Sequence, residues 1–181
     1  AITWQKPLAG TYEIVARATD RFKEPADSAP LSLTIGLPAS TARFMGSALG
    51  LGGNWKGLFG GEGFQVVNSG KQLPPFLTLK DNGTRTFSWE DGLSDPRALV
   101  HVNDPLRVAA CWVASPAFTL DLSFNDGAPH ILTCYFLDWD SVSRKERILL
   151  IDPKTGLPLD SEEMSEFHDG KYLRWLVQGR V

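Results

Sequence analysis

The stretch GNWKGLFGGEGF, residues 53–64, is the part of the sequence that says most about the fold. It belongs to a glycine-dense run over residues 46–63, in which Trp55 and Phe59 stand among the glycines and Phe64 follows them. Glycine allows positive φ and a close approach of neighbouring backbone, while aromatic rings supply flat apolar surface. The run therefore predicts a shaped loop entering a β-domain, not a helix or an ordinary strand.

The composition describes a folded chain with no electrostatic reason to bind nucleic acid. With 181 residues, of which 43% are hydrophobic and 22% charged, the chain has room for one domain plus a smaller piece. The net charge is −3 and the basic residues are scattered, so nucleic acid is not an expected partner. No apolar run is long enough to cross a bilayer, so no membrane partner is expected.

Short strands separated by Gly, Pro and Asn-Gly turns are predicted along the whole chain. Residues 118–124 alternate most clearly, with Phe118 and Phe124 among the inward positions. Residues 171–177 alternate as well, with Leu173, Trp175 and Val177 inward, whereas residues 161–166 could form at most one helical turn. A strand spacing of roughly 8–12 residues is typical of a β-sandwich or barrel. The predicted fold class is all-β.

Residues 1–36 predict three strands, one of them a period-2 alternation over residues 8–20. The segments ITWQKPLAGTYEIVARATD and SAPLSLTI resemble the C-terminal strands of bacterial immunoglobulin-like repeats, whose GTY tyrosine forms a tyrosine corner. The resemblance implies that residues 1–36 end such a module, that Tyr12 makes the corner contact and that residues 37–40 are a linker. It also implies a longer, multi-modular protein, because the front strands of a repeat are missing. The alternative is that these strands belong to the following domain.

Residues 41–181 resemble a galactose-binding-like jelly-roll β-sandwich, close to malectin-type domains. The resemblance lies in GNWKGLFGGEGF, HILTCYFLDWDSVSRKERILLIDPKTG and GKYLRWLV. The GNWKG and LDWD motifs are also similar to those of modules at the ends of large bacterial secreted proteins. The resemblance implies a secreted module that binds carbohydrate without catalysis. The sequence departs from the family where a closing strand is expected after Val181, so either the chain is cut or the sheet edge is closed in another way. An edge left open could pair with another chain.

Sugar binding requires an aromatic face for the C–H side of a pyranose and planar polar groups for its hydroxyls. The expected ligand-binding residues lie in the glycine loop and in the LDWD loop, which faces it by family analogy: Trp55, Phe59, Asp138, Trp139, Asp140 and Arg144. The alternative is structural. Trp55 and Phe59 would then plug the end of the sandwich, and Trp139 would pack between two turn-capping acids. Three further tryptophans are predicted to be core residues: Trp89, Trp112 and Trp175.

Metal binding and catalysis have weaker support in the sequence. Asp138, Asp140 and Ser143 cluster oxygens of the kind that calcium binds, so a structural calcium is an alternative to a salt-bridged loop. No catalytic motif occurs. A glycosidase-like carboxylate pair would have to be Glu62 and Asp138. The histidines are expected at the surface: His101, His130 and His168.

Cys111 and Cys134 lie in apolar runs, which favours two buried free thiols over one disulfide. The leading hypothesis is a non-catalytic carbohydrate-binding module of a secreted bacterial protein, such as a glycoside hydrolase. Its partners would be an oligo- or polysaccharide and further modules of the same chain. The alternatives are a structural or adhesive module, favoured if the rings of Trp55, Phe59 and Trp139 are buried, and a glycan-active hydrolase.

Overall fold

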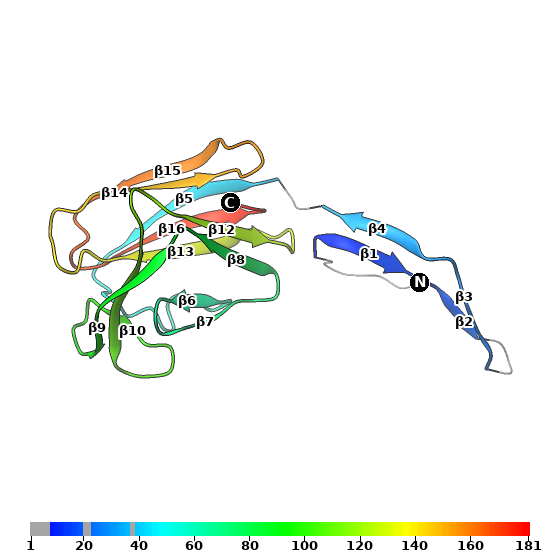
Figure 1. The fold of residues 1–181 in the computed structure, drawn as a ribbon, viewed down its shortest axis with the longest axis horizontal. Helices are drawn as coiled ribbons and strands as arrows, with labels where there is room; N and C mark the ends of the chain where they lie inside the picture. Colours follow the sequence, from blue (N-terminus) through cyan, green and yellow to red (C-terminus); the bar gives the residue numbers. More distant parts are fainter. Residues whose placement is uncertain (1–7, 20–22, 37–38) are drawn as a thin grey trace.

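The computed structural model describes residues 8–19, 23–36 and 39–181, and every regular element in these ranges is a β-strand. The predicted all-β class is confirmed. Figure 1 shows an arm, residues 8–36, extending away from a body, residues 39–181. No helix able to span a membrane occurs in the described ranges.

The strands are numbered in chain order. Those of the arm are β1 (Gly10–Ile14), β2 (Arg17–Thr19), β3 (Pro25–Asp27) and β4 (Leu31–Ile35). Those of the body are β5 (Thr41–Ala48), β6 (Phe64–Val66), β7 (Gly70–Gln72), β8 (Leu77–Asn82), β9 (Arg85–Leu93), β10 (Leu99–Val100), β11 (Arg107–Val113), β12 (Thr119–Phe124), β13 (His130–Phe136), β14 (Glu146–Ile151), β15 (Pro158–Met164) and β16 (Lys171–Gln178).

The arm consists of two antiparallel pairs, β1 with β4 and β2 with β3. The single strand predicted over residues 8–20 is divided between β1 and β2, and the strand expected at residues 2–4 lies outside the described residues, as do linker residues 37–38. The Tyr12 hydroxyl donates to the Leu8 carbonyl at 2.7 Å, the backbone contact expected of a tyrosine corner. Ile14 lies opposite Leu31, and both side chains are exposed.

The arm meets the body at the turn between β12 and β13. The Ala9 N–H donates to the Asn125 carbonyl at 2.7 Å, and the Asn125 N–H donates to the Phe76 carbonyl at 2.7 Å. One backbone hydrogen bond therefore connects the start of the arm to a turn that is itself anchored in the body.

The main core of the body lies between two groups of strands. β13, β16 and β5 form one antiparallel sheet in that order, and β12 pairs with β8 in another. Leu173, Trp175 and Val177 of β16 are buried, as their alternation predicts, and belong to one apolar cluster with Leu122 and Phe124 of β12. Burial of large apolar side chains from both sheets supplies most of the driving force for their packing.

Residues 179–181 continue from β16 and run beside β12. The N–H groups of Leu122 and Val181 each donate to the other residue's carbonyl at 2.9 Å, and the Phe124 N–H donates to the Gly179 carbonyl at 2.8 Å. β12 therefore lies between β8 and residues 179–181. The last residues of the chain cover this edge of β12.

One prediction of local structure is wrong, the inward position of Phe118, and another is narrowed. The sequence allows residues 161–166 at most one helical turn, and they form none, because most of them lie in β15, which the turn after β14 brings back as a hairpin partner. Such pairing outweighs the weak intrinsic preference of Ser and Glu. Phe118 is 38% exposed, because it precedes β12 and lies outside the ladder that β12 forms with β8.

The backbone of Gly53 passes directly against residues 96–100. The Gly53 N–H donates to the Pro96 carbonyl at 2.8 Å, and the Val100 N–H donates to the Gly53 carbonyl at 3.1 Å. A Cβ atom at position 53 would lie 1.8 Å from the Ala98 carbonyl oxygen. Glycine is required here by space, and this contact fixes where the glycine loop begins.

His130 joins the glycine loop to the β12–β13 turn. Its side chain is buried, with Nδ1 at 3.0 Å from a Glu62 oxygen and Nε2 at 3.0 Å from an Asp126 oxygen. The rings of Phe76 and Phe124 stack on the imidazole with centroid distances of 4.4 and 5.1 Å. The predicted surface location is wrong, because two carboxylates and two rings accommodate this histidine. Burial lowers the pKa of His130, but its hydrogen bonds to Glu62 and Asp126 outweigh this and leave the pKa raised.

We expect Gly53→Ala to lower the free energy of unfolding by about 3 kcal/mol or more, because the added methyl group collides with backbone. Gly61→Ala is the matched control, since a Cβ atom there meets nothing within 4 Å and the φ of Gly61 is ordinary. Urea unfolding measures both variants. Equal midpoints would contradict the close approach at Gly53.

We expect stability to depend on the protonation of His130. Because the pKa of His130 is higher in the folded chain than its unfolded value of about 6.5, protonation of His130 stabilises the fold. This stabilisation is fully present when the pH is below the unfolded pKa. This stability is lost as the pH rises through the raised folded-state pKa. In the parent protein, the urea concentration at the unfolding midpoint should therefore fall as the pH is raised. His130→Gln keeps hydrogen-bonding groups but does not titrate, so its midpoint should fall less over the same pH range. An unchanged fall in this variant would assign the effect to other groups.

Candidate functional site

The aromatic residues of the glycine loop face the interior. The Trp55 side chain is 8% exposed, its indole N–H donates to the Val100 carbonyl at 2.7 Å, and its ring lies 4.9 Å from that of Phe64. Phe59 is half-buried and lies 4.6 Å from the Tyr172 ring. The expectation that Trp55 stacks on a ligand is therefore wrong. Its ring belongs instead to a second apolar cluster, whose buried residues are Trp55, Val66, Val108 and Tyr172.

The loop after β13 is held together by one arginine. Asp138 is 1% exposed, and both it and Asp140 accept hydrogen bonds from Nη1 of Arg144. The Arg144 backbone N–H also donates to Asp138, at 3.1 Å. Asp140 further accepts the indole N–H of Trp89 at 2.9 Å. The hydrogen bonds from Arg144 and then from Trp89 lower the pKa of Asp140, so this carboxylate stays charged below neutral pH.

Trp139 packs inside this loop and is half-buried. The Arg97 guanidinium lies over its ring, 4.6 Å from the centroid, and an Arg97 nitrogen lies 3.0 Å from Nε2 of His168. Nδ1 of His168 lies 2.9 Å from the Asp138 carbonyl and 2.8 Å from that of Ser141. Because two carbonyls and a guanidinium flank the ring, Nδ1 donates and Nε2 accepts. These contacts assign Trp139 a packing role.

The guanidinium of Arg144 lies between Asp138 and Asp140, the two carboxylates that were candidate calcium ligands. The Ser143 N–H donates to the Ser141 hydroxyl at 3.1 Å. No group of three or more His, Cys, Asp or Glu side chains suited to a metal occurs among the residues that the structure describes. The two carboxylates fit an arginine, and we derive no role for calcium here.

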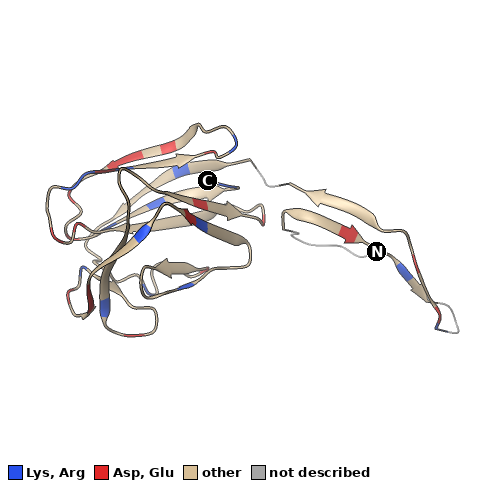
Figure 2. Cartoon of the chain, in the orientation of Figure 1, with Lys and Arg blue, Asp and Glu red and all other residues tan. Residues whose placement is uncertain are grey.

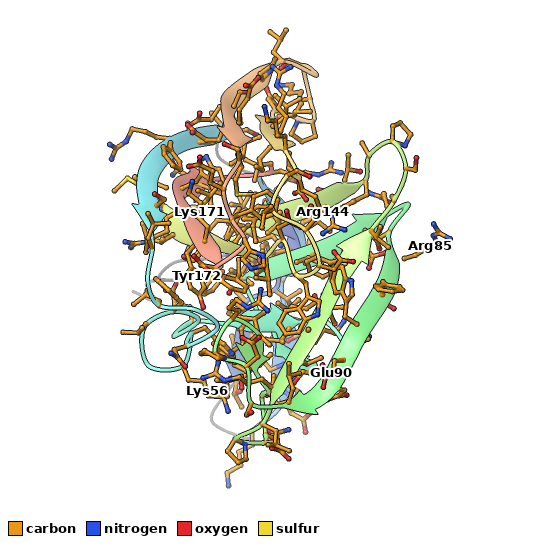
Figure 3. The ribbon with its side chains drawn as sticks, turned by 90° about the vertical axis from the view of Figure 1, so that its left-hand side faces the viewer. Lys56, Arg85, Glu90, Arg144, Lys171 and Tyr172 are labelled. Carbon is orange, nitrogen blue, oxygen red and sulfur yellow. The ribbon has the colours of Figure 1, made fainter. Side chains whose placement is uncertain are left out.

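The structure reveals a surface groove that the sequence analysis did not locate. It has a volume of about 380 Å³ and lies beside β9. Its lining residues come from β9, β11 and the loop after β13: Arg85, Thr86, Phe87, Trp89, Val113, Asp140 and Arg144. The groove thus includes two of the predicted site residues, Asp140 and Arg144. Figure 3 shows Arg85 projecting from the outer margin of the body.

Two aromatic rings form the apolar wall of the groove. Phe87 is 50% exposed, and its ring meets that of Trp89 edge-on at 5.1 Å and 86°. Ser88 pairs with Ala110 and Glu90 with Ala109, so Trp89 is an extra residue, a β-bulge, in the ladder. A bulge redirects a side chain, and Trp89 here reaches Asp140. Trp89 was predicted to be a core residue. It does pack against buried apolar residues, but it also lines the groove.

The signal for this groove is present in the sequence but incomplete. The alternation over residues 85–89 already places Phe87 and Trp89 on one face. Their exposure depends on β9 lying at the end of its sheet, beside β11 alone in the order β10-β11-β9 of the described residues. Alternation gives the face of a strand, but the position of that strand in its sheet is set by distant segments.

Cys111 is paired with Phe87 in the ladder, and Cys134 lies in β13. Both are free thiols, so the disulfide alternative is wrong. Burial raises the pKa of Cys111, with Glu146 adding to the rise, and burial raises the pKa of Cys134 to about 12. Both thiols are therefore protonated at neutral pH and unsuited to nucleophilic chemistry.

Glu62 and Asp138, the candidate glycosidase-like carboxylate pair, each contact a different partner. Asp138 is buried beneath Arg144, and Glu62 contacts His130. A carboxylate that is 1% exposed cannot reach a glycosidic bond in this conformation. Figure 2 shows acidic and basic residues along strands and loops in several parts of the body. The groove is suited to binding by ring contact and hydrogen bonds.

We expect Arg144→Met to lower the free energy of unfolding by about 2–3 kcal/mol, because Asp138 stays buried without its cation. The effect should not exceed this, since the Arg144 side chain is 42% exposed and water screens part of the interaction. Adding Asp138→Asn should recover part of the loss. Arg85→Met, in the same groove, is the control and should change stability by less than about 0.5 kcal/mol. Equal losses from the two arginine changes would contradict this role of Arg144.

No protein family, curated protein or solved structure matches this chain.

Proposed function

We propose that this chain is a non-catalytic carbohydrate-binding module of a secreted, multi-modular bacterial protein, such as a glycoside hydrolase. Its body would be a jelly-roll β-sandwich of the galactose-binding-like, malectin type. The observation that best supports carbohydrate binding is the half-exposed ring of Phe87 beside Trp89, in an open groove that also contains charged side chains.

The groove combines the two features that sugar binding requires. Phe87 offers an apolar ring to the C–H face of a pyranose, and Trp89 supports that ring edge-on. Asp140 and Arg144 offer planar polar groups for hydroxyls, and their positions are fixed by their mutual bond. Rigid placement lowers the entropic cost of binding, because fewer side chains must be ordered by the ligand.

The proposed site differs from the one expected from sequence. Asp140 and Arg144 keep a binding role, because both line the groove. Trp55 and Trp139 become supports, and Asp138 acts by holding Arg144. Phe59 is half-buried against Tyr172 and takes no part.

An adhesive or spacer module is the second candidate, and the arm favours it. Ile14, Leu31 and Leu33 are 42%, 64% and 40% exposed on one face of the β1–β4 pair. A two-stranded ribbon is marginal in water, and an apolar face of this kind is suited to contact with another module. The burial of Trp55 also agrees with this candidate. The two functions are compatible, because the arm and the groove involve different residues.

We expect the chain to bind at least one member of a panel of soluble oligo- and polysaccharides in isothermal titration. Phe87→Ala should weaken that binding at least tenfold, because it removes the ring that faces the ligand. Phe118→Ala, another exposed phenylalanine outside the groove, is the matched control and should bind as the parent does. Absence of saturable binding to every glycan, or equal affinity of parent and Phe87→Ala, would contradict the proposal.

A further inference from the structure

The groove has more free hydrogen-bond donors than free acceptors. Arg85 carries five N–H donors, and its guanidinium has no hydrogen bond or ion pair among the described residues. Arg144 donates to Asp138 and Asp140 through Nη1, and its Nε and Nη2 have no partner in the same ranges. The oxygens of Asp140 already accept hydrogen bonds from Arg144 and Trp89. A ligand that complements this groove must therefore supply acceptors.

Arg85 is also the arginine of the groove that contacts no carboxylate among the described residues. The single charge of Arg144 is more than offset by Asp138 and Asp140, since both carboxylates contact its guanidinium. Glu146 interacts with Arg144 and with Cys111, but it is not one of the residues that line the groove. An anionic group placed beside Arg85 would gain a charge-assisted hydrogen bond, with no competing carboxylate on that arginine.

Arg85 and Phe87 are two residues apart on β9, so their side chains leave the same face of the strand about 7 Å apart. A sugar ring stacked on Phe87 would have one edge directed at Arg85. The planar fork of a guanidinium matches a carboxylate, which accepts two parallel hydrogen bonds. We propose that the groove recognises glycans containing uronic acids, with Arg85 as the residue that selects the carboxylate. This inference rests on the proposed carbohydrate function.

The test uses oligosaccharides of galacturonate and of mannuronate, each beside its methyl ester, titrated into the whole chain. The ester keeps the sugar skeleton and removes the charge. We expect at least one acid to bind tenfold or more tightly than its ester, with a preference that shrinks as salt is added. Arg85→Gln should abolish the preference and leave the urea midpoint unchanged. Arg43→Gln, an exposed arginine of β5 outside the groove, is the control and should keep it.

The outcomes separate this inference from the function on which it rests. Equal affinity for acid and ester, or a preference that survives Arg85→Gln, would overturn the uronate assignment while carbohydrate binding stands. Equally tight binding of a sulfated, uronate-free glycan would also overturn it, because Arg85 would then recognise any anion. No binding to these oligosaccharides or to the neutral panel would overturn both proposals.

Discussion

The groove depends on a single guanidinium shared by two carboxylates. Asp138 is buried, and a buried carboxylate is costly unless a cation and hydrogen bonds accompany it. Arg144 meets that need and also binds Asp140, which in turn accepts the indole N–H of Trp89. The ion pairs of the loop thus position the carboxylate that binds an aromatic side chain of a different strand. The shape of the groove follows from an electrostatic requirement in the interior.

Much of the fold was predictable from local sequence, and the site was predictable only in part. The alternation of Leu173, Trp175 and Val177 gave the buried face of β16 correctly, because that strand lies between two others. The same reasoning could not tell that Phe87 is exposed, since exposure depends on which strands flank β9. The pairing of β15 with β14 and the burial of His130 likewise depend on partners distant in sequence or in another element.

The two aromatic groups of the body illustrate this limit. Trp55 stands in the most distinctive stretch of the chain, yet its ring is turned into the second apolar cluster. Phe87 and Trp89 stand in an unremarkable strand, yet they border the groove. Residue type and glycine content indicate that a loop is shaped, but the direction of the Trp55 ring follows from its contacts with Val100 and Phe64.

The irregular ladder of β9 has a further consequence for solubility. Within the described residues β9 pairs with β11 alone, so its other edge has backbone groups that could template another chain. Besides the extra residue at Trp89, Gly92 is unpaired in the ladder between Asp91 and Leu93 and has a φ of 76°. Two such irregularities twist a strand and break the even spacing of its N–H and C=O groups. We therefore expect the bulge that directs Trp89 toward the groove also to make this edge a poor nucleus for intermolecular β-sheet.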